Sequence, residues 1–149
     1  MINHIWSVLC QRSVVDSESN NISLIDVFEK LEVNLSIPDS QKELKKINVP
    51  VKYEIVSLWD YDEVDQGKKI SLQVNFKSPS GKTEKILERI LELPHGKKRL
   101  RDRINVHGIV VEDSGRYFFQ VNEKKEKDKN YKVISTLPLE IVVNKSTSN

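Results

Sequence analysis

The sequence contains a single cysteine, Cys10, and so lacks the pair that an intrachain disulfide needs. A small domain that dispenses with a disulfide fits a reducing compartment. No apolar run approaches the ~20 residues that a membrane-spanning helix requires. The N-terminal segment carries no basic region, and Gln11 and Arg12 interrupt its apolar run, so it does not have the pattern of a signal peptide. We therefore expect a cytoplasmic protein that does not associate with membranes.

The chain also lacks a large excess of charge of either sign. Its 24 basic and 22 acidic residues leave a net charge of +2. A near-neutral balance gives no general attraction to nucleic acid or to anionic membranes, so only a local cluster of charge could produce one. The length of 149 residues suits one domain with its own core. We expect a single domain over residues 1–144 and a flexible C-terminal tail over 145–149.

Alternation of apolar and polar residues is the commonest local pattern. It is clearest where Ile70, Leu72, Val74 and Phe76 alternate with polar residues. This period is typical of an antiparallel strand with one buried face. Similar segments recur between polar turns. The sequence therefore predicts an all-β fold, a single antiparallel Greek-key β-sandwich of about seven to nine strands.

Two segments have an ambiguous period. Residues 22–31 and 83–93 place apolar side chains at spacings that suit a strand or a helix. We favour strands for both. In the first segment a β-bulge near Phe28 and Glu29 would reconcile the two patterns. A single helical turn is also expected at residues 41–46, within a polar loop.

The segment from Asp113 to Tyr117 is the most specific signal in the chain. Its glycine, Gly115, allows a tight corner, and the hydroxyl of Tyr117 can bond back to the corner backbone. We expect the Tyr117 ring to be buried. We also expect this corner to pair the strands at 101–111 and 115–121.

A run of acidic residues at 60–65 provides the strongest hint of a metal site. Calcium-binding loops of the EF-hand type need an oxygen ligand at the fifth position and glycine at the sixth. Those positions are Val64 and Asp65, so the pattern fails. A looser calcium site, or a metal-dependent enzyme built on this loop, stays open as an alternative function.

A second cluster is basic, and it is the best candidate for a binding surface. We call it the basic strip, and it consists of Lys97, Lys98, Arg99, Arg101 and Arg103. In an extended strand alternate residues lie about 6–7 Å apart on one face, a spacing that suits contacts with a phosphate backbone. The other interpretation is an edge strand that charge protects from aggregation. Few aromatic residues lie beside the strip in sequence, so any binding of nucleic acid is expected to be modest.

The corner motif resembles that of immunoglobulin-like sandwiches. The similarity rests on Asp113, Gly115 and Tyr117, with Trp59 as a core tryptophan. Such domains place their second cysteine where this chain has Phe119. The resemblance implies an immunoglobulin-like architecture and carries no functional residues.

Most of the chain resembles an uncharacterised family of small bacterial β-sandwich proteins. The similarity lies in Cys10 and Asp16, followed by Ser23-Leu24-Ile25 and by Phe28-Glu29-x-Leu31. The later Pro79-x-Gly81 turn and Gly115-x-Tyr117 corner also suit this family. It implies a bacterial cytosolic protein, with a link to mobile or phage-related genes. No site residue is transferred by this resemblance.

No linear motif for catalysis is present, and no cofactor is expected. We therefore expect a non-enzymatic interaction module that recognises a protein partner or self-associates. The alternatives are binding of nucleic acid through the basic strip and metal-dependent chemistry at residues 60–65.

Overall fold

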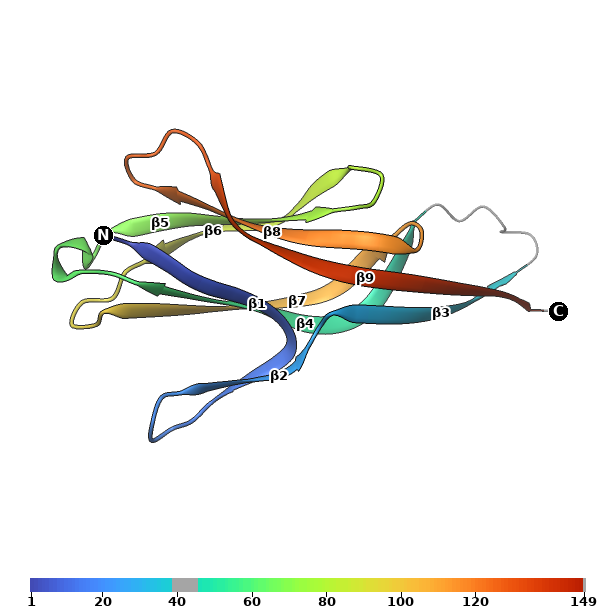
Figure 1. Ribbon diagram of the computed structural model, residues 1–149, viewed down its shortest axis with the longest axis horizontal. Helices are drawn as coiled ribbons and strands as arrows, with labels where there is room; N and C mark the ends of the chain where they lie inside the picture. The colour runs from blue at the N-terminus through green and yellow to red at the C-terminus, as the bar shows by residue number, and fades with distance from the viewer. Residues whose placement is uncertain (39–45, 149) are drawn as a thin grey trace.

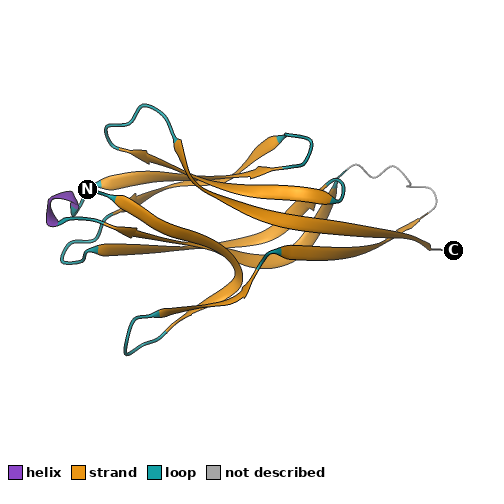
Figure 2. Cartoon of the chain, viewed as in Figure 1, coloured by secondary structure: helices purple, strands orange, loops and turns teal. Residues whose placement is uncertain are grey.

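The computed structural model describes residues 1–38 and 46–148, and these residues form an all-β protein. Its strands are β1 (Asn3–Val15), β2 (Ile22–Val27), β3 (Lys30–Pro38), β4 (Ile47–Asp60), β5 (Lys69–Lys77), β6 (Thr83–Glu92), β7 (Arg99–Val111), β8 (Gly115–Lys125) and β9 (Lys132–Ser148). A one-turn 3-10 helix, Glu63–Asp65, lies between β4 and β5 (Figure 2). The helical turn expected at residues 41–46 cannot be compared with the structure, because residues 41–45 lie outside the described part of the chain.

The strands form two sheets that share one core. The four-stranded sheet has the order β2-β1-β4-β7, and the five-stranded sheet has the order β3-β9-β8-β5-β6 (Figure 1). Alternate residues of β4 and β5 point into the core, including Ile55, Trp59, Leu72 and Val74, all fully buried. The period-two pattern of the sequence therefore correctly identified the inner faces of these strands.

The corner after β7 forms as predicted, but it joins strands of different sheets. Tyr117 is fully buried, and its hydroxyl donates to the Asp113 carbonyl at 2.7 Å and accepts from the Glu112 amide at 3.1 Å. Because β7 pairs with β4 and β8 pairs with β5 and β9, the predicted pairing of 101–111 with 115–121 is wrong. A sharp corner lets the chain change sheets instead of turning back beside itself.

Gly115 is required by a close approach. A Cβ at this position would lie 2.7 Å from Cγ of Pro79, in the turn between β5 and β6. A proline ring cannot swing aside as a flexible side chain can. Any larger residue at 115 would therefore push the corner away from this turn.

Both ambiguous segments are strands. Residues 83–92 form β6, which pairs with β5, so the helical alternative is wrong there. Residues 22–27 form β2 beside β1. The bulge expected at Phe28 and Glu29 is instead a break, because the chain leaves one sheet there and enters the other as β3.

The last strand runs further than the sequence indicated. Residues 145–148, expected in a flexible tail, continue β9 in register with β3. This pairing is parallel, whereas the other strand pairs within residues 1–38 and 46–148 are antiparallel. A parallel partner distant in sequence leaves no local signal, and so the polar composition of this segment predicted a tail.

The β1–β2 hairpin folds back on the outside of the four-stranded sheet. Hydrogen-bonded pairing of β1 with β4 ends at Cys10, opposite Glu54, while pairing with β2 covers residues 10–15. Beyond Cys10 the strand is free of β4 and bends. Figure 1 shows the hairpin running back toward the end of the molecule where the N-terminus lies. This bend creates the site described below.

Across the described ranges, no helix has the length and apolar character needed to cross a membrane.

Candidate binding groove

The basic strip lies on β7, an edge strand of the four-stranded sheet, and on the turn that precedes it. Arg99, Arg101 and Arg103 lie opposite Asp60, Leu58 and Val56 of β4, so they occupy one face of the sheet. Lys97 and Lys98 are exposed in the turn between β6 and β7. The alternation predicted from the sequence is therefore confirmed for the three arginines.

Arg103 holds the base of the folded-back hairpin. Its Nε donates to the Ser13 hydroxyl at 2.7 Å, and a terminal nitrogen donates to the Ser13 carbonyl at 3.0 Å. The same guanidinium lies 3.7 Å from Glu54, whose side chain is only 7% exposed. Arg103 thus both fixes the hairpin and neutralises a buried carboxylate.

Arg101 holds the tip of the same hairpin. Its guanidinium donates to the carbonyl of Asn20 at 3.0 Å, a contact between residues 81 apart in sequence. Two of the five residues predicted for a ligand therefore bind the protein's own backbone. Lys97, Lys98 and Arg99 remain exposed.

Between the hairpin tip and the sheet lies an open groove of about 600 Å³, here called the hairpin groove. Trp6 and Leu58, both partly buried, contribute apolar surface. Lys97, Arg99 and Arg101 contribute positive charge. The lining also includes polar residues of the hairpin tip, Ser19, Asn20 and Asn21. The groove therefore combines an apolar surface with cationic and amide donors.

The turn that carries Lys97 and Lys98 is fixed from the connection between β4 and β5. The side chain of Gln66 donates to the Lys97 carbonyl and accepts from the Gly96 amide, both at 3.0 Å. The amide of Tyr61 donates to the Lys98 carbonyl at 3.0 Å. The lysine side chains therefore extend from a backbone that is held in place.

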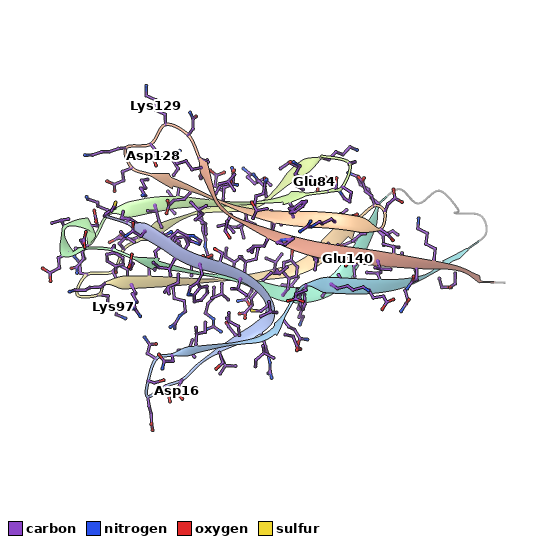
Figure 3. All side chains as sticks on the ribbon, in the orientation of Figure 1. Asp16, Glu84, Lys97, Asp128, Lys129 and Glu140 are labelled. Atoms are coloured by element: carbon purple, nitrogen blue, oxygen red, sulfur yellow. The ribbon has the colours of Figure 1, made fainter. Side chains whose placement is uncertain are left out.

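The hairpin tip is also ordered, in this case by local bonds. The carboxylate of Asp16 accepts hydrogen bonds from the amides of Ser19 and Glu18 at 2.7 and 2.9 Å. These donors, with the Ser19 amide as the largest contribution, lower the pKa of Asp16 below its usual value of 3.8. Asp16 is therefore ionised at neutral pH, and Figure 3 shows its position at the hairpin.

Trp6 is a groove residue that the sequence did not connect with the basic strip. In sequence it is only one apolar member of an alternating strand, 91 positions from Lys97. The structure brings it to the basic strip because β1 and β7 flank β4. Aromatic residues are scarce near the basic strip in sequence, but Trp6 lies beside it in the structure.

Two carboxylates of the acidic run at 60–65, those of Asp62 and Asp65, meet at the amino group of Met1. Asp60 ends β4, while Asp65 is buried and accepts from Lys68 at 2.8 Å. The hydrogen bond from Lys68, followed by that from the amino group of Met1, lowers the pKa of Asp65 to about 2. Within residues 1–38 and 46–148, no group of three or more His, Cys, Asp or Glu side chains is arranged to hold a metal ion.

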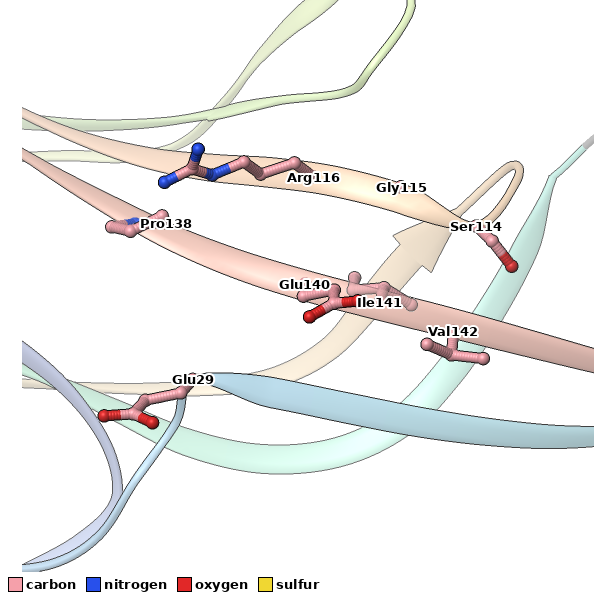
Figure 4. A pocket seen from close by; sticks show the side chains of 8 residues that line it. All are labelled: Glu29, Ser114, Gly115, Arg116, Pro138, Glu140, Ile141 and Val142. Atoms are coloured by element: carbon pink, nitrogen blue, oxygen red, sulfur yellow. The ribbon is translucent and has the colours of Figure 1, made fainter.

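A second and larger hollow, of about 840 Å³, lies over β8 and β9. Figure 4 shows Arg116 on β8, Glu140 on β9 and Glu29 just before β3, with charged ends that do not meet. The guanidinium of Arg116 lies 5.4 Å from the centre of the Phe118 ring. Because charges of both signs are spread across this surface, it favours no particular ligand chemistry.

Cys10 lies beneath the folded hairpin and is fully buried. Burial raises the pKa of its thiol, and the Glu54 carboxylate raises it further against the opposing effect of Arg103. The thiol is therefore protonated at neutral pH, the state in which cysteine is a poor nucleophile.

No family model matches the chain, and no curated protein is similar to it in sequence. Among solved structures, the N-terminal domain of PorA is similar over 93% of this chain and 97% of its own length, with a TM-score of 0.31 and 8% sequence identity. These comparisons assign the chain to no family.

Proposed function

We propose that this protein is a non-enzymatic binding module that recognises a protein partner through the hairpin groove. The observation that carries the proposal is the joining, in one groove, of Trp6 and Leu58 with Lys97, Arg99 and Arg101. Exposed aromatic and arginine side chains are the groups that contribute most to protein–protein affinity. The described residues that line the groove supply an indole ring, cations and side-chain amides, which are groups suited to recognition.

We also propose that the architecture is a Greek-key sandwich of the immunoglobulin type. Support comes from the hydrogen-bonded Tyr117 corner on β8. Immunoglobulin domains place a cysteine two residues after this tyrosine, where its disulfide crosses the two sheets. Here that position is Phe119, and its ring lies 5.4 Å from the ring of Tyr53 on β4. An aromatic pair would thus replace the disulfide, consistent with a binding function carried by loops and edges.

Photo-crosslinking in cells that express the chain tests the function. A photoreactive phenylalanine at Asn21, in the groove, is compared with one at Lys129, on the opposite side of the molecule from the hairpin (Figure 3). The proposal expects discrete protein adducts from position 21 and none of the same mass from position 129. An adduct of twice the chain's mass would identify the partner as a second copy.

The control for this experiment is Trp6→Ala combined with the position-21 crosslinker. Trp6 is partly buried on the groove surface, so its removal should reduce the adduct without unfolding the chain. Circular dichroism checks the fold. Equal adducts from positions 21 and 129, or an adduct that does not depend on Trp6, would contradict the proposal.

Binding of single-stranded nucleic acid is the second candidate, and Trp6 is the observation that favours it. A base could stack on this ring while Arg99 and Lys97 contact phosphates. These two contacts would give a slope of log affinity against log salt of roughly −1.4. Fluorescence anisotropy of labelled oligothymidylate between low and physiological salt measures that slope. A flat salt dependence, or binding that survives Arg99→Glu, would exclude this candidate.

A further inference from the structure

We infer that the hairpin groove takes an extended, acidic polypeptide segment that carries one large apolar side chain. The inference rests on the proposed function, a groove that binds protein, and names the chemistry of the partner. It follows from three features of the groove, namely its unpaired cations, its uncovered apolar surface and its amide side chains.

Two of the three cations of the groove, Lys97 and Arg99, are available for a ligand, whereas Arg101 already donates to Asn20. Within the described part of the chain, Lys97, Arg99 and Arg101 form no ion pair with a carboxylate, whereas Arg89 and Arg103 do. Lys97 and Arg99 are also exposed. Carboxylates spaced along an extended peptide would pair with these groups, and such charge-assisted bonds are stronger than neutral ones.

The apolar part of the groove indicates one anchoring side chain. Trp6 and Leu58 lie on neighbouring strands in register with each other, and both are only partly buried. Together they form a small surface that a single Leu, Phe or Met side chain would cover. Burying such a side chain against this surface removes apolar area from water and so favours binding.

The hairpin tip offers groups suited to a peptide backbone. Asn20 and Asn21 are exposed, and in the described ranges their side-chain amides form no hydrogen bond with the protein. An amide both donates and accepts, so it can satisfy the alternating N–H and C=O groups of an extended segment. A phosphodiester backbone offers acceptors only.

The charges beside the groove favour separated carboxylates over a continuous polyphosphate. Asp16 and Glu18, both exposed, lie at the same hairpin tip that contributes Asn20 and Asn21. The lowered pKa of Asp16 keeps it ionised there. The phosphates of a nucleic-acid strand would be repelled by these two carboxylates, whereas a peptide can place a neutral residue opposite them.

Selection from a random dodecapeptide library displayed on phage tests the inference with the whole folded chain. Selected peptides should be enriched in Asp and Glu and should contain at least one large apolar residue. The same selection against the Arg99→Glu chain should lose that enrichment. Neutral or basic selected peptides, or an enrichment that Arg99→Glu leaves intact, would overturn the inference.

A synthetic copy of the most enriched peptide then gives the affinity by isothermal titration. Arg99→Glu and Lys97→Glu should each weaken binding by roughly tenfold or more, as expected for removing and reversing a charge contact. Lys98→Glu is the matched control, since Lys98 is a neighbour in the same strip that does not line the groove, and it should change affinity less than about twofold. Arg101 is unsuitable because it also holds the hairpin. An equal loss in all three variants would show only general charge attraction and would contradict a groove-specific site.

The outcomes separate this inference from the proposed function. Groove-specific crosslinks together with peptides that lack acidic residues would retain a protein-binding groove and reject an acidic partner. Tighter, Arg99-dependent binding of oligothymidylate than of any selected peptide would reject the peptide and leave the groove as a nucleic-acid site.

Discussion

The Tyr117 corner and the folded-back hairpin differ in how the chain holds them together. The corner closes through bonds between residues four and five apart, around a ring with no solvent exposure. The hairpin is tied to the sheet by Arg101 and Arg103, which reach backbone and side-chain groups 81 and 90 residues away. The corner is buried and held by contacts that are local in sequence, whereas the hairpin is partly exposed and held by contacts that are distant in sequence.

This difference indicates a division of labour within one small domain. Buried aromatic packing at the corner stabilises the two sheets, because apolar burial is the main source of folding free energy. The hairpin forms one side of the groove. It leaves Trp6 partly exposed, and two arginines hold it to the sheet. Regions with few buried contacts open more readily than cores. Mutations in the two regions should therefore have different signatures.

The largest effect is expected from Phe119→Ala, in the core beside the corner. The Phe119 ring is fully buried and lies 4.7 Å from the Phe76 ring and 5.4 Å from the Tyr53 ring. Its loss should reduce the free energy of unfolding by about 3–5 kcal/mol. Urea denaturation measures the change, with Phe118→Ala as a partly exposed control one residue away. A loss below about 1 kcal/mol would mean that this aromatic cluster does not hold the sheets together.

Tyr117→Phe should have a smaller effect in the same region. The substitution keeps the buried ring and removes only the hydroxyl, which leaves the Asp113 carbonyl and the Glu112 amide without their partner. The expected loss is about 1–2 kcal/mol, again from urea denaturation. Hydrogen exchange of the hairpin amides should be the same in Tyr117→Phe as in the unmodified chain when the two are compared at equal global stability. An unaltered denaturation midpoint would show that the corner does not need its hydrogen bonds.

The sequence predicted the corner and missed the hairpin groove for the same physical reason. Asp113 and Tyr117 lie within five residues, so the Tyr117 hydroxyl reaches the corner backbone through local geometry. The alternating residues of β5 likewise reveal which of its faces is buried. No local pattern tells that Ser13 will meet Arg103, or that Trp6 will share a groove with Arg99. Those contacts depend on strand order and on where β1 leaves β4.

The basic strip has features that the sequence predicts and others that it does not. Its alternation on one face and its place on an edge strand were predictable from the residues. Its division into hairpin ties, Arg101 and Arg103, and exposed cations, Lys97, Lys98 and Arg99, was not. A strand that appeared uniform in sequence has two roles because only part of it lies under the hairpin.

Arg103→Ala should affect the hairpin more than the whole domain. It removes both bonds to Ser13 and leaves the Glu54 carboxylate without its cation. We expect a global loss of about 1–3 kcal/mol together with faster amide exchange over residues 11–25 than over the corner. Hydrogen exchange followed by mass spectrometry separates the two regions. The double variant Arg103→Met, Glu54→Gln removes the unpaired charge and should recover part of the global stability without restoring the hairpin.

Uniform acceleration of exchange across the chain in Arg103→Ala would contradict the division between the two regions. It would mean that the hairpin and the core open together.

The smallest expected effect lies at the hairpin tip and depends on pH. The pKa of Asp16 in the folded protein is below its usual value of 3.8, chiefly because the Ser19 amide and then the Glu18 amide donate to its carboxylate. A group with a depressed folded pKa stabilises the fold above its unfolded value, and that contribution is lost as the pH falls through the folded pKa. The tip should therefore keep its bonds at pH 5 and loosen only below pH 3.8. NMR titration of the Ser19 and Glu18 amides measures this transition. In Asp16→Asn the side-chain oxygen still accepts these bonds without titrating, so the transition should vanish while the tip stays ordered. A transition at or above pH 3.8 would show that the two amides do not stabilise the ionised carboxylate. The hairpin tip would then be less ordered than the proposed groove needs.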